Sequence, residues 1–112
     1  MKDNENIQII TLPEQFDVRS ISAVEVLWEK TVIKKPEIIG MDCGNLKYID
    51  SSAIGTLVKF YNSSLNKNIE MHLFDLRSDL ARIFDATKIS RLISVISKES
   101  FYQSYFSEDL SN

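Results

Sequence analysis

The sequence predicts an α/β fold in which helices cover a mainly parallel central sheet of about five strands. Short β-branched or apolar runs alternate along the chain with longer segments whose apolar residues recur at helical spacing. Strands and helices that alternate with short connections form right-handed crossover units, and such units give parallel strands. An antiparallel strand is possible at the N-terminal edge, and it would make the sheet mixed.

At 112 residues the chain has the length of one domain, which we expect to span 1–112. Its folded core is expected at about residues 7–107, with polar tails at 1–6 and 108–112. Strands are expected at 7–12, around Phe16, and at 37–43, 69–74 and 92–96. Helices are expected at 18–34, at 51–66, around 80–84 and at 101–106.

The helix at 18–34 has a continuous apolar face, and it ends before Pro36, which disfavours helical geometry in the preceding residue. Core burial of Trp28 is favoured over a binding role because this residue falls on the apolar face. The residues expected to face inward are Val18, Ile21, Val24, Leu27, Trp28 and Val32. In the terminal helix, aromatic residues are likewise expected to dock the helix on the core: Phe101, Tyr102, Tyr105 and Phe106.

Composition argues against several classes of protein. The formal net charge is −3 and the basic residues are scattered, so the basic stripe that nucleic-acid binding needs is missing. Cys43 is the single cysteine, which rules out an intramolecular disulfide and favours a core role in its apolar strand. His72 is also alone, so a strand residue is favoured over a metal ligand. No leader segment or membrane-length apolar run is found, and we expect a cytoplasmic protein.

The stretch from Tyr48 to Val58 joins the end of an apolar run to the start of an amphipathic helix. Apolar residues recur from Ile54 at helical spacing, so Ser51 and Ser52 fall at or just before the helix N-terminus. A hydroxyl there can accept hydrogen bonds from free backbone N–H groups, and the helix dipole tolerates negative charge. Two interpretations remain: the serines are only helix caps, or one of them is displayed to carry a phosphate.

The segment Asp50-Ser51-Ser52-Ala53-Ile54-Gly55 resembles the D-S-[ST]-G-[LI]-G motif of STAS domains, specifically that of the bacterial anti-sigma factor antagonists. The resemblance extends to Met41-Asp42-Cys43, to Phe16-Asp17 and to the segments at 73–75 and 83–89. Ala53 departs from the family pattern, since it replaces a glycine and puts a methyl group beside the serine. Glu14 also stands where glycine is common. The resemblance implies that most helices lie on one face of the sheet.

The resemblance also implies a function by partner switching. The unphosphorylated protein would bind a serine kinase that doubles as an anti-sigma factor, and would so release a sigma factor for transcription. Phosphorylation of the serine directly after the aspartate, Ser51, would end this binding, and a metal-dependent serine phosphatase would reverse the modification. ATP and Mg²⁺ would belong to the kinase, so this chain needs no cofactor. The implied partner-binding residues are Asp17, Asp50, Ser51, Ser52, Ala53 and Thr56.

Catalysis is not expected of this chain. Ser51 does not lie in a G-x-S-x-G segment, the single imidazole of His72 belongs to a different strand, and no glycine-rich phosphate loop exists. Asp42 and Asp50 are two carboxylates without a third ligand, which is weak evidence for a metal site. The alternative to the switch is a STAS subunit with a structural or regulatory role in a transport or stress-sensing complex, in which Ser51 is never phosphorylated.

Overall fold

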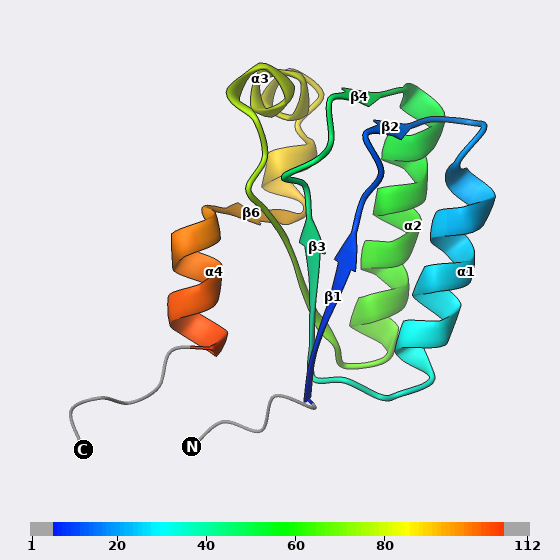
Figure 1. The fold of residues 1–112 in the computed structure, drawn as a ribbon, viewed down its shortest axis with the longest axis vertical. Helices are drawn as coiled ribbons and strands as arrows, with labels where there is room; N and C mark the ends of the chain where they lie inside the picture. Colours follow the sequence, from blue (N-terminus) through cyan, green and yellow to red (C-terminus); the bar gives the residue numbers. More distant parts are fainter. Residues whose placement is uncertain (1–5, 107–112) are drawn as a thin grey trace.

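The computed structural model describes residues 6–106. The tails expected at 1–6 and 108–112 therefore lie outside the described residues, apart from Asn6, and so does Ser107 at the expected end of the core. Figure 1 shows the chain as a central sheet with helices on both of its faces.

Within residues 6–106 the central sheet has four strands in the order β1-β3-β5-β6, and all neighbouring strands are parallel. These strands are β1 (Ile7–Thr11), β3 (Ile38–Asp42), β5 (Glu70–Phe74) and β6 (Ser94–Ile96). A second, two-stranded parallel sheet is formed by β2 (Gln15–Phe16) and β4 (Tyr48–Ile49). The mainly parallel sheet is thus confirmed. The antiparallel edge strand is not found among residues 6–106, where β1 itself forms the edge and pairs only with β3.

In the described part of the chain, four α-helices connect and cover these strands: α1 (Ile21–Val32), α2 (Ser51–Asn66), α3 (Ser78–Ala86) and α4 (Lys98–Tyr105). A 3₁₀ turn, η2 (Ile89–Arg91), follows α3. Helices α1 and α2 lie side by side on one face of the sheet, and α4 lies on the other face (Figure 1). Buried residues of α1, α2 and α3 belong to one large core cluster, which fits the expectation that most helices lie on one side.

The large core lies between the sheet and the α1–α2 pair. Because side chains alternate along a strand, Ile39 and Met41 of β3 face these helices together with Met71 and Leu73 of β5. Trp28 is buried there, and its ring stacks on Phe60 of α2 at a centroid distance of 4.5 Å. The core role predicted for Trp28 is confirmed.

Two residues assigned to the inward face of the first helix are exposed instead. Helix α1 begins at Ile21, because Asp17 to Ser20 form a turn in which the Asp17 carbonyl accepts from the N–H groups of Ser20 and Ile21. Val18 therefore lies in this turn and is 69% exposed, and Leu27 is 44% exposed on the flank of the helix. Helix α1 thus buries a narrower stripe than the sequence predicts.

Cys43 is fully buried in the large core, as predicted. Burial raises the pKa of its thiol to about 12, so the side chain stays protonated near neutral pH. His72 is a residue of β5, also as predicted, and its Nδ1 lies 2.7 Å from the hydroxyl oxygen of Ser94. Its Nε2 lies 2.7 Å from Glu70 Oε2, and the Tyr105 hydroxyl donates to the same carboxylate. This polar group ties the C-terminal turn of α4 to the sheet.

Helix α4 docks on the opposite face of the sheet through Phe101, which is fully buried. The Phe101 ring stacks on Phe74 of β5 with a centroid distance of 4.3 Å, and Ile7 completes this smaller core. Gly40 of β3 makes room for the ring, since a Cβ atom at this position would lie 2.4 Å from Phe101 Cζ. The missing side chain at position 40 therefore determines how closely α4 approaches the sheet.

Two glycine-to-alanine changes should have opposite effects on stability. Gly40→Ala should lower the free energy of unfolding by roughly 1–3 kcal/mol, because the stacked Phe101 ring has to move. Gly55→Ala should raise it by about 0.5–1 kcal/mol, because Gly55 lies inside α2 and an added Cβ meets nothing within 4 Å. Urea denaturation of both variants checks these signs. Equal stability of the two variants would contradict the packing described for α4.

Candidate functional site

The two-stranded sheet brings together two segments that are far apart in the sequence. Gln15 and Phe16 of β2 pair with Tyr48 and Ile49 of β4, directly before α2 begins. The backbone N–H of Asp50 then donates to the carbonyl of Phe16 at 3.3 Å. As a result, the turn that precedes α1 lies against the N-terminus of α2, at the end of the molecule toward which β1 and β3 point (Figure 1).

Asp50 is the N-cap of α2, so of the two interpretations the one in which Ser51 or Ser52 is only the helix cap is wrong. Its backbone is extended, with φ −103° and ψ 175°, and its Oδ1 accepts a hydrogen bond from the N–H of Ala53 at 2.8 Å. The other carboxylate oxygen, Oδ2, accepts from the N–H of Val18 at 3.1 Å. One side chain thus caps the helix and fixes the turn before α1.

Ser51 and Ser52 are the first two residues of α2, and both are exposed. Since Asp50 fulfils the capping role, neither hydroxyl is needed for the helix. Within residues 6–106 neither serine side chain takes part in a hydrogen bond with another protein group. The two hydroxyls are therefore available for modification or for contact with another molecule.

Asp17 is buried beside this surface and forms an ion pair with Arg19. Its Oδ1 accepts from the backbone N–H of Arg19 at 2.9 Å, and its Oδ2 lies 2.8 Å from Arg19 Nη2. These side-chain and backbone hydrogen bonds from Arg19 lower the pKa of the Asp17 carboxyl group. The pair holds the guanidinium group, which is itself mostly exposed, on the turn that contacts Asp50.

Two exposed apolar residues of this surface are not part of the predicted site. Val18 donates its backbone N–H to Asp50, while its side chain is left exposed. Tyr48 of β4 is 52% exposed, two residues before the helix cap. Their place depends on the pairing of β2 with β4, and a two-residue strand leaves too weak a pattern in the sequence to find it. Together with Arg19, Ser51 and Ser52, they form what we call the Ser51 surface.

Ala53 and Thr56, two residues of the predicted site, have buried side chains. Ala53 belongs to the large core cluster, so its methyl group points into the protein and not toward the surface beside Ser51. The Thr56 hydroxyl donates to the carbonyl of Ser52 at 3.1 Å. Ala53 thus packs the first turn of α2 against the core, and Thr56 holds that turn by a hydrogen bond.

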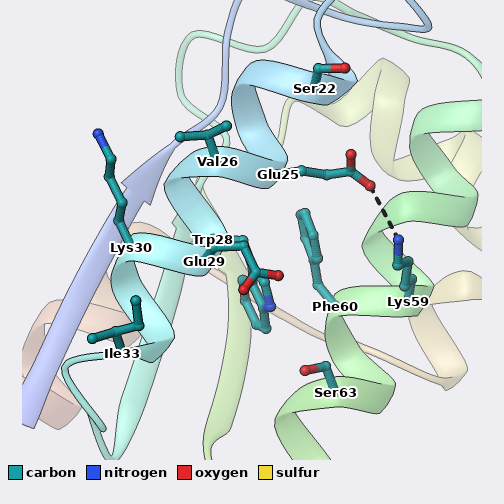
Figure 2. A pocket seen from close by; sticks show the side chains of 10 residues that line it. All are labelled: Ser22, Glu25, Val26, Trp28, Glu29, Lys30, Ile33, Lys59, Phe60 and Ser63. Carbon is teal, nitrogen blue, oxygen red and sulfur yellow. Dashed lines mark hydrogen bonds and ion pairs between the residues drawn. The ribbon is translucent and has the colours of Figure 1, made fainter.

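A separate groove runs between α1 and α2 (Figure 2). It has a volume of about 550 Å³, with Trp28 and Phe60 among its lining residues. Lys59 Nζ and Glu25 Oε2 bridge the two helices across it at 3.3 Å. Lys59 is eight residues after Ser51, so it lies about 12 Å further along the helix axis. The charged side chains that line the groove balance one another, since there are two acidic residues (Glu25 and Glu29) and two basic ones (Lys30 and Lys59).

Within residues 6–106, no three side chains of His, Cys, Asp or Glu are grouped so that they could hold a metal ion. No helix in the same part of the chain is long and apolar enough to span a membrane.

Removal of the Asp50 carboxylate should destabilise the protein, whereas removal of either serine hydroxyl should not. We expect Asp50→Ala to lower the free energy of unfolding by roughly 1–2 kcal/mol, the usual cost of losing an N-cap. Ser51→Ala and Ser52→Ala serve as matched controls and should stay within about 0.5 kcal/mol of the unmodified protein. Urea denaturation measures all three. A loss in Ser51→Ala equal to that in Asp50→Ala would mean that the serine caps the helix.

Comparison with known proteins places this chain in a family. The family description of the STAS domain matches residues 1–104. An anti-sigma-B factor antagonist of Listeria monocytogenes is 27% identical over 94 residues, which are 84% of this chain and 82% of that protein.

Two solved structures have the same fold. The anti-sigma factor antagonist SpoIIAA in its unphosphorylated form superimposes with a TM-score of 0.58 at 14% identity, covering 82% of this chain and 93% of SpoIIAA. A sulfate transporter family protein of Wolinella succinogenes gives a TM-score of 0.72 at 14% identity, covering 80% of this chain and 75% of that chain. With a family match over nearly the whole length and an α/β architecture shared with these structures, the chain belongs to the STAS domain family.

Proposed function

We propose that this protein is an anti-sigma factor antagonist whose binding to its partner is switched off by phosphorylation of Ser51. The observation that carries the proposal is the exposed Ser51 hydroxyl at the start of α2, which is free because Asp50 caps the helix. The likeness to the Listeria anti-sigma-B factor antagonist, which covers most of both chains, supports the same class of function.

The partner is a serine kinase that also acts as an anti-sigma factor. In the unphosphorylated state the Ser51 surface binds this kinase, which then releases its sigma factor for transcription. The exposed side chains of Val18 and Tyr48 supply apolar contact area, and Arg19 supplies a positive charge. Such a mixture of apolar and charged contacts is typical of protein interfaces. This activity is binding, and it takes place in the cytoplasm with the kinase and the sigma factor.

Phosphorylation ends the binding through charge. A phosphate on Ser51 adds about −1.5 to −2 charges next to the Asp50 carboxylate. The N-terminus of α2 compensates part of this charge, so the fold tolerates it. An interface that covers the phosphate has to strip water from it, and that desolvation is costly without an opposite charge in the partner. A metal-dependent serine phosphatase removes the phosphate and restores binding.

Substitution of Ser51 should separate phosphorylation from binding. Ser51→Ala should bind the kinase like the unmodified protein but accept no phosphate, while Ser51→Glu should bind it more weakly. The loss in Ser51→Glu should be partial, because a carboxylate carries about one charge and lacks the geometry of a phosphate. Isothermal calorimetry with each candidate serine kinase of the host measures binding, and intact-mass measurement after incubation with ATP measures phosphorylation.

Ser52→Ala is the matched control, since it removes a neighbouring exposed hydroxyl and should still be phosphorylated at Ser51. Phosphate found on Ser52 would mean that Ser52, and not Ser51, is the phosphorylated residue. Unaltered tight binding of Ser51→Glu, together with no phosphorylation by any kinase tested, would favour the alternative of a STAS subunit with a fixed structural or regulatory role.

A further inference from the structure

Strand β1 is an open edge of the central sheet. It pairs with β3 on one side, and within residues 6–106 no strand pairs with its other side. In Figure 1 no helix is drawn across β1, which lies at the front of the sheet. Within the described part of the chain, the outer side of β1 therefore has no neighbouring strand.

The backbone of β1 presents unpaired groups on this outer side. Leu12, just after the strand, donates its N–H to Asp42 of β3 at 3.0 Å. Because the backbone groups of successive strand residues point to opposite sides, those of Ile7, Ile9 and Thr11 point away from β3. Within residues 6–106, no hydrogen bond outside the β1–β3 pairing uses the N–H or C=O of these three residues. They leave a row of donors and acceptors that fits a further strand.

The strand lacks the features that usually protect an edge. Edge strands are commonly interrupted by charged residues, prolines or bulges. The strand Ile7–Thr11 contains no charged residue and no proline. Its register with β3 runs through five consecutive pairs without a bulge. The side chain of Ile9 at its centre is 36% exposed. A positive charge lies beside the strand, since Lys34 Nζ donates to Gln8 Oε1 at 3.4 Å.

We propose that β1 pairs in antiparallel fashion with β1 of a second copy of this chain, with a two-fold axis at Ile9. The N–H and C=O of Ile9 both point outward, so the two Ile9 residues exchange both of their hydrogen bonds across the axis. In this register Ile7 faces Thr11 of the second copy, and the exposed Ile9 side chains of the two copies cover each other. The two central sheets join into one continuous sheet.

The occupant is a second copy because this strand is complementary to itself. A two-fold axis places each residue against the same stretch of the other chain, so any charge near the centre would face a like charge. Residues 7–11 are uncharged and have an apolar residue in the middle, which removes this repulsion. Antiparallel pairing also places the two Ser51 surfaces at opposite ends of the joined sheet, where both stay accessible. The inference is therefore independent of the proposed function.

The interface is small, so the dimer should form only at high concentration. Pairing through five residues buries less area than a standard stable interface. Sedimentation equilibrium over a concentration series into the high micromolar range should give a mass that rises from monomer to dimer. Ile9→Lys should stay monomeric throughout, because two ammonium groups would meet at the axis. Leu65→Lys is the matched control, since Leu65 is 56% exposed on α2, and this variant should dimerise like the unmodified protein.

Amide hydrogen exchange locates the interface by residue. At dimer concentration the amides of Ile7, Ile9 and Thr11 should be protected, and on dilution they should exchange freely while the amides of Gln8 and Ile10 remain protected by β3. The melting temperature of Ile9→Lys at low concentration shows that the variant is folded. A monomer at every concentration would overturn the proposal, and so would a dimer in which the Ile9 amide exchanges freely or in which Ile9→Lys still dimerises.

Discussion

The Asp50 carboxylate joins the two segments on which the candidate site depends. Its Oδ1 accepts from Ala53 in the first turn of α2, and its Oδ2 accepts from Val18, thirty-two residues earlier in the chain. Without the first bond the helix would lose its cap. Without the second, the turn that carries Val18 and Arg19 would lose its direct link to the start of α2. Together with the pairing of β2 and β4, this one side chain brings the turn before α1 to the start of α2.

The division of roles between Asp50 and Ser51 also explains how a phosphate fits the proposed switch. A serine that capped α2 would have its oxygen engaged with backbone N–H groups, and phosphorylation would cost the helix its cap. Here the cap is the preceding residue, and the Ser51 hydroxyl makes no hydrogen bond within residues 6–106. In the proposed switch, the modification would therefore change the charge of the surface and leave the packing of the buried residues Ala53 and Leu57 in place.

The α/β class and the order of its elements could be predicted from the sequence, because apolar spacing records which face of a helix is buried. The spacing after Ile54 locates α2 and the exposed serines at its start. The spacing of apolar residues does not show which of several good capping residues takes the N-cap position, so the sequence could not distinguish Asp50 from the serines as the cap of α2. The exposure of Val18 was missed for a related reason, since the turn before α1 is held by contacts distant in sequence. That β1 is an edge strand within residues 6–106 could not be predicted, because it depends on which strands are neighbours in space.

The central claim is that Ser51 can carry a phosphate while the fold stays intact, and the stability of the phosphorylated protein tests it most directly. The protein would be phosphorylated to completion, the site verified as Ser51 by mass spectrometry, and its free energy of unfolding measured by urea denaturation beside that of the unmodified protein. We expect the two values to agree within about 1 kcal/mol, because the positive end of α2 offsets part of the repulsion from Asp50. A loss of several kcal/mol would contradict the account, since it would mean that the Ser51 hydroxyl is part of what holds the helix N-terminus together.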